Sequence, residues 1–329
     1  MKKVVVIGSN SFSGSDFIDL LLETGEYDVI GVSRSPEKSA LFLPYKKRAS
    51  KNFRFYQIDL NRDLEALEKI LLEFTPGYIV NFAAQSEVAP SWEYPHHWFQ
   101  TNTVALTQLA NCLKGMKFLQ RYVHISSPEV YGSCEGNVLE TAPLNPSTPY
   151  AASKASGDLS LFTFYKNFGL PLVMIRATNV YGAHQQLFKI IPRAVINIKA
   201  AQTIDLHGGG GAIKSYIHIR DVSIGERLIM EKGRIGEIYH LSPDQGVSVR
   251  SLVETICSEL RVDFKEVTRD VAERLGQDKA YTIDSSKARS EFGWCPRMSL
   301  KDGLKGVIDW VLHSYEEIIK EPLHYVHKD

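Results

Sequence analysis

The first half of the chain alternates short apolar runs with amphipathic stretches, and this alternation restricts the fold more than any other feature. Each apolar run is short enough to be a strand buried on both faces, and each amphipathic stretch has the period of a helix. Repeated strand and helix units form a parallel sheet with helices on both sides. We therefore predict an α/β fold with a Rossmann-type doubly wound parallel sheet. Strands are expected at residues 4–7, 29–32, 53–58, 78–82, 121–125 and 172–175, and helices at 12–24, 64–74, 99–114 and 150–168.

The pattern loosens after Gly182. Helices are expected near residues 190–201, 250–260 and 300–315, and no low-complexity linker separates them from the first half. We expect a smaller α+β cap domain that packs closely against the sheet and encloses a cleft. The predicted boundaries place residues 1–180 and roughly 216–243 in the first domain, and residues 181–215 and 244–329 in the cap.

The charge balance narrows the range of partners. Lysine and arginine together number 38, as do aspartate and glutamate, so no net field attracts nucleic acid or an anionic membrane. No apolar run approaches the roughly 20 residues of a membrane span, and the N-terminal run is too short for a signal sequence. The four cysteines lie far apart, without the spacing of a metal site. We expect a cytoplasmic protein that binds a small molecule and no metal.

The first predicted strand ends in a glycine turn that leads directly into a helix. Gly8 permits the tight turn, Gly14 permits close packing of the helix on the strand, and the free N–H groups at the helix start attract a pyrophosphate. Ser11 stands where a third glycine is usual. The turn indicates a dinucleotide site, although an ordinary serine and glycine turn would contain the same residues.

Tyr150 and Lys154 stand four residues apart at the start of a predicted helix, so their side chains share one face. Tyrosine has a pKa of about 10 and becomes a base near neutral pH only when a nearby cation favours the phenolate. Lys154 can provide that charge. The pair also follows a strand that ends in Ser126 and Ser127. The alternative is a solvated helix face in which this spacing arises by chance.

Ordered motifs along almost the whole chain resemble the extended short-chain dehydrogenase/reductases, specifically the NAD(P)-dependent nucleotide-sugar epimerases and dehydratases. The similarity is greatest to dTDP-glucose 4,6-dehydratase-like enzymes. Besides the glycine turn, the motifs are residues 81–86, 124–132, 149–155, 176–182, 187–192, 217–221, 272–278 and 281–284. The resemblance implies that the first domain binds the dinucleotide and that the cap binds a nucleotide-diphosphate sugar.

The resemblance also implies a role for each matching residue. Tyr150 is the base at the sugar 4-hydroxyl, and Lys154 is its partner and a ribose contact. Ser127 is the hydroxyl beside them, and Glu129 is the dehydratase glutamate. Besides Tyr150 and Lys154, the implied cofactor contacts are Gly8, Ser11, Phe12, Gly14, Ser33, Arg34, Asp59, Leu60, Phe82, Ala83 and Ala84. The implied substrate contacts are Ser86, Asn179, Lys189, Lys214 and Arg274.

Glu129 and Pro128 bear on the reaction. Glu129 favours a 4,6-dehydratase, which oxidises the sugar at C4, eliminates water across C5 and C6 and returns the hydride to C6. dTDP-glucose dehydratases carry an aspartate in place of Pro128, so a nucleotide-sugar 4-epimerase or a UDP-glucuronate decarboxylase-like enzyme stays open. A dinucleotide-binding regulator without catalysis is a further alternative, which the joint presence of Tyr150, Lys154 and Glu129 opposes. As the nucleotide, dTDP, UDP, GDP and CDP are all open.

The end of the second predicted strand bears on the cofactor. Ser33 stands where an acidic residue would bind the ribose hydroxyls of NAD, and Arg34 beside it can pair with the 2′-phosphate of NADP. We therefore expect NADP rather than NAD.

Two further patterns concern the surface. Apolar residues occupy more than one face of the predicted helix 150–168, which indicates a second packing partner and hence a homodimer. His96 and His97, and the terminal His324 and His327, lack a second pair at metal spacing and are expected to be exposed polar residues.

Overall fold

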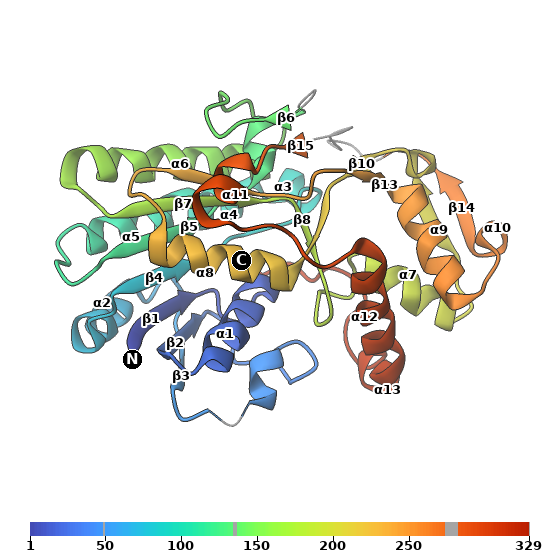
Figure 1. Ribbon diagram of the computed structural model, residues 1–329, viewed down its shortest axis with the longest axis horizontal. Coiled ribbons are helices and arrows are strands. Elements are labelled where there is room, and N and C mark those ends of the chain that lie inside the picture. The colour runs from blue at the N-terminus through green and yellow to red at the C-terminus, as the bar shows by residue number, and fades with distance from the viewer. Residues whose placement is uncertain (49, 134–136, 274–281, 329) are drawn as a thin grey trace.

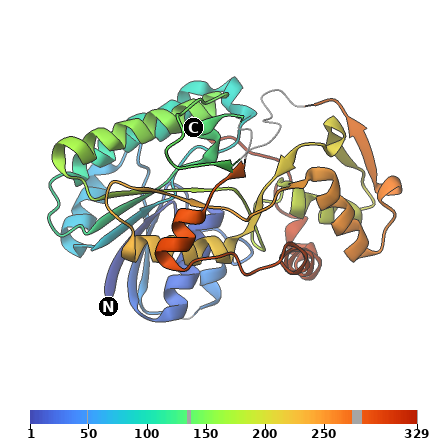
Figure 2. The ribbon, with the colours of Figure 1, turned by 45° about the horizontal axis from the view of Figure 1, so that its top comes forward.

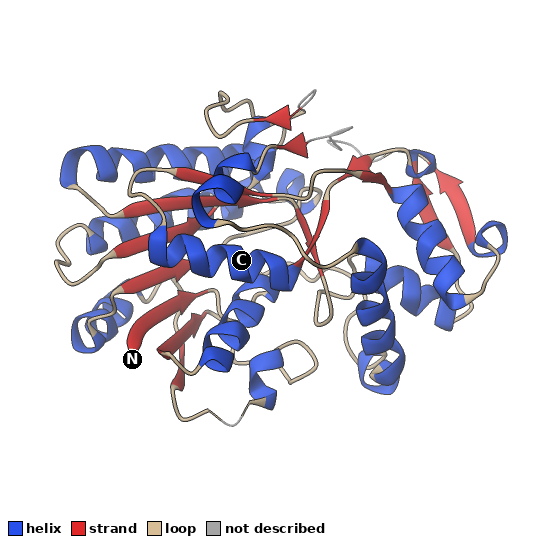
Figure 3. Cartoon of the chain, viewed as in Figure 1, coloured by secondary structure: helices blue, strands red, loops and turns tan. Residues whose placement is uncertain are grey.

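The computed structural model describes residues 1–48, 50–133, 137–273 and 282–328 (Figure 1). Its centre is a seven-stranded sheet in the order β12-β7-β5-β4-β1-β2-β3, in which every neighbouring pair is parallel. The predicted doubly wound parallel sheet is confirmed, with helices on both faces (Figure 3). The strands are β1 (Lys2–Ile7), β2 (Tyr27–Ser33), β3 (Phe53–Gln57), β4 (Tyr78–Asn81), β5 (Arg121–Ile125), β7 (Leu172–Ala177) and β12 (Ile238–Leu241).

Helices cover both faces of the sheet because alternate residues of each strand point to opposite sides. On β1, Val4 and Val6 belong to one buried cluster, whereas Val5 and Ile7 belong to another. The strands are therefore apolar throughout, as expected when both faces are buried. The first cluster includes side chains of α1 (Phe12–Thr24) and α8 (Ile219–Lys232), and the second includes side chains of α2 (Leu64–Phe74), α5 (Leu106–Leu113) and α6 (Pro149–Phe168).

A second group of elements lies to one side of the sheet in both ribbon views (Figures 1 and 2). Its helices share a hydrophobic core of their own, separate from the two clusters of the sheet. None of the described helices combines the length and apolarity needed to span a bilayer. The group contains α7 (Ile190–Lys199), α9 (Val249–Leu260), α10 (Phe264–Val267), α12 (Leu300–His313) and α13 (Tyr315–Ile318), with β9 (Ile204–His207) paired to β14 (Thr268–Val271) and β10 (Ile213–Lys214) paired to β13 (Val247–Ser248).

Short elements connect these parts. Residues 179–181 and 216–218 form a two-stranded parallel pair, β8 with β11, between the sheet and the second group. The other short elements are α3 (Pro90–Glu93), α4 (Pro95–Phe99), α11 (Ser286–Phe292), β6 (Asn137–Val138), β15 (Thr282–Ile283), and the turns η1 (Pro44–Lys47), η2 (Gln100–Ala105), η3 (Pro128–Tyr131) and η4 (Gly208–Gly210).

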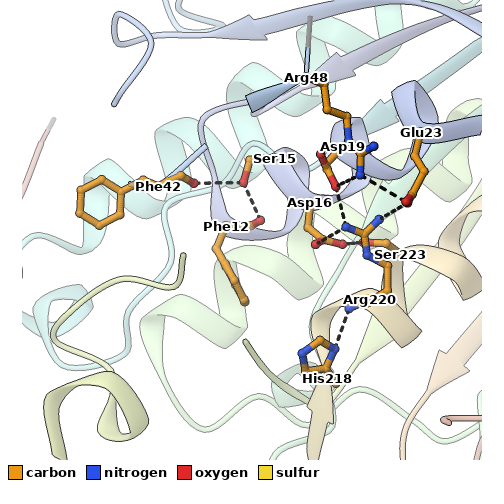
Figure 4. A network of polar contacts seen from close by, with 10 residues as sticks. All are labelled: Phe12, Ser15, Asp16, Asp19, Glu23, Phe42, Arg48, His218, Arg220 and Ser223. Carbon is orange, nitrogen blue, oxygen red and sulfur yellow. Dashed lines mark hydrogen bonds and ion pairs between the residues drawn. The ribbon is translucent and has the colours of Figure 1, made fainter. Parts of the chain in front are cut away.

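Helix α8 was not among the helices predicted from the sequence, because its buried face carries Asp221, Ser223 and Glu226 and so lacks a continuous apolar stripe. Polar contacts hold it against α1 (Figure 4). Arg220 forms ion pairs with Asp16 at 3.3 Å and with Asp19 at 2.6 Å, and the Ser223 hydroxyl donates to Asp16 at 2.7 Å. The chain then returns to the sheet as β12.

The helix predicted at residues 99–114 is interrupted by a π-helical turn, η2 (Gln100–Ala105), between α4 and α5. The Asn102 amide in this turn bonds the main chain of Gln85 at 2.8 and 2.9 Å and the hydroxyl of Ser153 at 2.9 Å. Helix α6 can approach closely because Gly157 has no side chain: a Cβ there would lie 2.3 Å from the Asn102 carbonyl oxygen. The π turn thus ties the end of β4 to the first turns of α6, as such turns often do at functional sites.

Candidate active site

The turn between β1 and α1 lies where the strand order reverses, with β2 on one side of β1 and β4 on the other. Gly8 has a φ of 85°, and a Cβ there would lie 2.6 Å from the Ala83 nitrogen. A Cβ on Gly14 would lie 2.4 Å from the Gly8 carbonyl oxygen, so close backbone approach requires both glycines. Ser11 is the N-cap of α1, since its Oγ accepts from the Gly14 N–H at 3.0 Å. This bond explains a serine in the middle of the turn.

A cavity of about 570 Å³ opens beside this turn, within the volume range of small-molecule sites. Most of the predicted cofactor residues meet there. Gly14, Tyr150 and Lys154 do not line it. The predicted residues in its wall are Gly8, Ser11, Phe12, Ser33, Arg34, Asp59, Leu60, Phe82, Ala83 and Ala84, together with the predicted substrate residue Ser86.

Residues that the sequence did not single out complete the cavity. The Asn10 amide donates to the carbonyls of Ser35 and Pro36 at 2.8 and 2.9 Å, and its N–H donates to the Ser33 hydroxyl at 3.0 Å. Asn10 therefore fixes the loop after β2, and its place inside the glycine turn could have indicated this role. Lys38 also lines the cavity, and burial followed by the charge of Lys328 lowers its pKa.

Tyr150 lies in the first turn of α6, beside the short helix η3. The Ser127 hydroxyl hydrogen-bonds its phenol, and the Glu129 carboxylate lies close enough to act on it. Burial, and then the negative charge of Glu129, raise the pKa of Tyr150, whereas the Ser127 bond lowers it. The ligand-free phenol is therefore protonated at neutral pH, and a positively charged ligand beside it would favour the phenolate.

Lys154 is buried one turn further along α6. Its Nζ donates to the Ile125 carbonyl at 2.9 Å and lies 3.3 Å from Nε2 of His124. Burial lowers the pKa of Lys154 to about 8, although the charge of Asp158 opposes this. Because both contacts come from β5, the ammonium is held at the carboxyl end of that strand.

A buried ion pair joins α6 to β7 behind Lys154. The Asp158 carboxylate accepts from Arg176 at 2.7 Å and from the Ser126 hydroxyl at 2.6 Å. Arg176 also donates to the hydroxyl of Tyr131, which lies in η3 and is 2.8 Å from Nε2 of His240. This network fixes η3 against α6, and so positions Ser127 and Glu129 in front of Tyr150.

The predicted substrate residues lie on several elements. Lys189, which precedes α7, forms an ion pair with Glu87 at 2.6 Å. The negative charge of Glu87 also raises the pKa of Tyr150. Asn179 on β8 pairs with Tyr216 on β11. Lys214, in β10, precedes Tyr216 by two residues. Arg274 lies outside the described residues.

A sequence model of the GDP-mannose 4,6-dehydratase family matches residues 5–307 of the chain. The chain belongs to this family. It is 35% identical to the dTDP-glucose 4,6-dehydratase of Streptomyces antibioticus over 74% of this chain and 73% of that one. It is 28% identical to the dTDP-glucose 4,6-dehydratase of Haemophilus influenzae over 95% of this chain and 99% of that one. It spans about half, 48%, of a trifunctional UDP-glucose 4,6-dehydratase, epimerase and reductase of Arabidopsis thaliana, at 26% identity over 96% of this chain.

Solved structures support membership of the GDP-mannose 4,6-dehydratase family. A dTDP-glucose 4,6-dehydratase from Streptomyces venezuelae, crystallised with NAD, has a TM-score of 0.89 and 32% identity over 96% of this chain and 98% of that one. A dTDP-glucose 4,6-dehydratase from Bacillus anthracis, in complex with NAD, has a TM-score of 0.87 and 28% identity over 96% of this chain and 98% of that one. A UDP-glucuronic acid 4-epimerase from Bacillus cereus, also with NAD, has a TM-score of 0.86 and 26% identity over 95% of this chain and 100% of that one.

The prediction of NADP is wrong, because these structures of related proteins contain NAD. The prediction treated the lack of an acid at Ser33, next to Arg34, as a sign of a 2′-phosphate. In the structure both residues contact groups of the protein itself. The Ser33 hydroxyl accepts from the Asn10 N–H, and the Arg34 guanidinium donates to the Lys328 carbonyl at 3.2 Å.

Proposed function

We propose that this member of the GDP-mannose 4,6-dehydratase family is a nucleotide-sugar 4,6-dehydratase that uses NAD. The observation that carries the proposal is that the Glu129 carboxylate lies near enough to raise the pKa of the Tyr150 phenol, to which the Ser127 hydroxyl is bonded. Tyr150 can then take the proton of the sugar 4-hydroxyl, and Glu129 can take the proton on C5 of the same ring. The dTDP-glucose 4,6-dehydratases that match nearly the full chain support this proposal.

The residues of the cavity fit NAD. The positive φ of Gly8 and the close contact at Gly14 bring backbone N–H groups to a helix N-terminus, which suits a pyrophosphate. Arg34 and Lys38 add positive charge to the same cavity. When bound, NAD supplies a nicotinamide ring that accepts the C4 hydride and later returns it at C6.

Tyr150 takes the proton of the sugar 4-hydroxyl while the C4 hydride leaves. The Ser127 hydroxyl holds the phenol oxygen in place for this transfer. Lys154, held at the end of β5, contributes positive charge at the start of α6. These three residues together perform the oxidation in this proposal.

Glu129 then acts on the 4-keto sugar. The carbonyl acidifies the C5 proton, and the Glu129 carboxylate removes it as the C5–C6 double bond forms and the C6–O bond breaks. Pro128 has no proton to give, so protonated Glu129 passes the same proton to the leaving oxygen, and water departs. Ser127 is the alternative relay for that proton. The hydride returns to C6 and a proton returns to C5, so the reaction is redox-neutral.

In this proposal the nucleotide diphosphate binds the cationic residues that the sequence resemblance assigns to the substrate. Lys189, Lys214 and Arg274, with the Asn179 amide, suit charge-assisted bonds to phosphate oxygens. Lys189 must leave Glu87 to reach the substrate. A lysine at 214 offers a point charge rather than a two-pronged guanidinium contact.

Incubation with dTDP-, UDP-, GDP- and CDP-sugars, followed by mass spectrometry of the products, tests the proposal. Loss of water supports the dehydratase. Loss of carbon dioxide would indicate decarboxylation, and an unchanged mass with an inverted C4 would indicate a 4-epimerase, the alternative that Pro128 leaves open. Tyr150→Phe should abolish turnover, whereas the exposed control Tyr56→Phe should not. A regulator without catalysis would leave every sugar unchanged.

We also propose a homodimer formed through α6. Leu159 on α6 is 60% exposed and Val104 on η2 is 43% exposed, while η2 packs directly against α6. Burial of this apolar surface against a second copy would be favourable. Light scattering should give twice the chain mass of 37.0 kDa, and Leu159→Glu should give a monomer. The division into a dinucleotide domain and a sugar-binding cap is part of the same proposal.

A further inference from the structure

The segment after α13, residues 321–328, crosses from the second group of elements to the sheet, and we name it the strap. In both ribbon views the chain leaves α12 and ends over the sheet side of the molecule (Figures 1 and 2). Its side chains alternate: Leu323, Tyr325 and His327 are partly buried, whereas Pro322, His324, Val326 and Lys328 are exposed. A period of two residues is that of an extended segment with two faces.

One face of the strap docks on the protein. The His327 ring stacks on Tyr94, with ring centres 4.7 Å apart and planes 5° apart, and on Trp98 at 5.3 Å and 4°. Its Nε2 lies 2.7 Å from Nδ1 of His97, a hydrogen-bond distance. His327 is therefore held rather than free in solvent, which corrects the expectation of an exposed histidine.

The same face also contacts the second group of elements. Tyr325 packs edge-on against Phe188, with ring centres 5.7 Å apart, and Leu323 packs against the hydrophobic core of α7, α9 and α12. The strap thus bridges both halves of the molecule.

The other face of the strap forms a wall of the cofactor cavity. Pro322, His324, Val326 and Lys328 all line the 570 Å³ space, and Tyr325 reaches it from the docking face. The Lys328 carbonyl accepts from Arg34, at the end of β2, and from the Gln85 side chain, after β4. The strap is therefore anchored at the ends of β2 and β4, the strands on either side of β1.

We propose that the strap is the outer wall of the dinucleotide site and retains NAD between turnovers. The cavity persists with the strap docked, so the segment encloses the ligand space rather than filling it. Retention suits the proposed dehydratase, on which this inference rests, because a redox-neutral reaction regenerates its cofactor in place. A cofactor that leaves after each turnover would gain nothing from such a wall.

The test measures dissociation of NAD from loaded, full-chain protein in the absence of any sugar. His327→Ala removes the stacked ring and the bond to His97, and a second variant ends at Lys320. His313→Ala, an exposed histidine on α12, is the matched control. NAD should dissociate about tenfold or more faster from both strap variants than from wild type, because the stacked contacts that hold the wall are lost. The control should release NAD at the wild-type rate.

Wild-type dissociation rates in both strap variants would overturn the inference. Faster NAD association in the variants with unchanged dissociation would also overturn it, because the strap would then compete with NAD. The product assay is separate: a wild-type enzyme that dehydrates its sugar while the variants retain NAD refutes only the strap. Accelerated release together with no dehydrated product refutes only the proposed reaction.

Discussion

The Ser127 hydroxyl hydrogen-bonds the phenol of Tyr150 across the gap between η3 and α6. The same oxygen accepts from the Glu129 N–H at 3.2 Å. One serine therefore links the proposed base of the oxidation to the backbone of the proposed base of the elimination. A change at Glu129 should consequently alter the oxidation that depends on Tyr150 as well as proton removal at C5 of the sugar.

Glu129→Gln should separate the two half-reactions. An amide cannot take the C5 proton, so turnover should fall by about 10²- to 10⁴-fold while substrate still reduces the bound cofactor. The absorbance of reduced nicotinamide and the incorporation of solvent deuterium at C5 measure the two steps. Glu93→Gln, an exposed change in α3, is the control. Unimpaired turnover in Glu129→Gln would show that the dehydratase assignment is wrong.

The same variant should also shift the pH dependence of the oxidation. The Glu129 charge raises the pKa of Tyr150, because a nearby anion disfavours the phenolate. Its removal lowers that pKa, so the rise of cofactor reduction with pH should move to lower pH in Glu129→Gln. Single-turnover reduction followed across the pH range measures this. An unmoved or oppositely moved limb would mean that the two side chains are not coupled.

Lys189 and Glu87 should have opposite effects on substrate binding. Lys189→Gln removes a cation from the proposed diphosphate site and should raise KM about tenfold or more with a smaller effect on kcat. Glu87→Gln removes the partner at 2.6 Å and frees Lys189, so KM should fall. Steady-state kinetics with the accepted nucleotide sugar measures both. Equal increases in KM would indicate that the ion pair serves binding as a unit.

Asp158→Asn should destabilise the fold. The variant leaves the buried Arg176 charge uncompensated, and breaking such a pair costs roughly 3–5 kcal/mol of unfolding free energy. Asp28→Asn breaks an exposed pair with Arg54 and should cost roughly 0–1 kcal/mol. Urea denaturation of the two variants makes the comparison. Similar losses of unfolding free energy in the two variants would show that burial does not determine how much the Asp158–Arg176 pair stabilises the fold.

The sequence predicted the parts of the site that depend on neighbours along the chain. Gly8, Gly14 and Tyr150 belong to local motifs, and α1 and α2 begin and end at the predicted residues. It missed α8, whose buried face includes the charged residues Asp221 and Glu226. The Asp221 carboxylate accepts from the N–H of Met298, far along the chain, and Glu226 is buried near Asp16 of α1. An apolar period cannot show such a face.

The contacts between distant segments were equally invisible. Lys189 with Glu87, and His327 with Tyr94, are brought together only by the folded chain. The alternation of Leu323, Tyr325 and His327 is too short to distinguish a docked strap from a solvated end. The NADP prediction also missed such a contact, since Lys328, the partner of Arg34, lies at the other end of the described chain.

Lys154 should make the stability of the fold depend on alkaline pH. Its ordinary pKa is 10.5, and burial lowers it to about 8 in the folded protein. Between these values the unfolded chain binds more protons than the folded one, so a rise in pH stabilises the fold. Below about pH 8 both states are protonated, and this contribution stays constant at its least favourable value.

Comparison with Lys154→Met isolates that effect, because methionine does not titrate. The unfolding free energy of the wild type relative to Lys154→Met should be flat below about pH 8 and rise by up to about 3 kcal/mol towards pH 10.5. Lys166→Met, an exposed change on the same helix, should show no such slope relative to wild type. Urea denaturation at successive pH values measures all three proteins. A difference between wild type and Lys154→Met that stays constant above pH 8 would mean that the folded lysine keeps its proton, held by the Ile125 carbonyl and the Asp158 charge against the cost of burial.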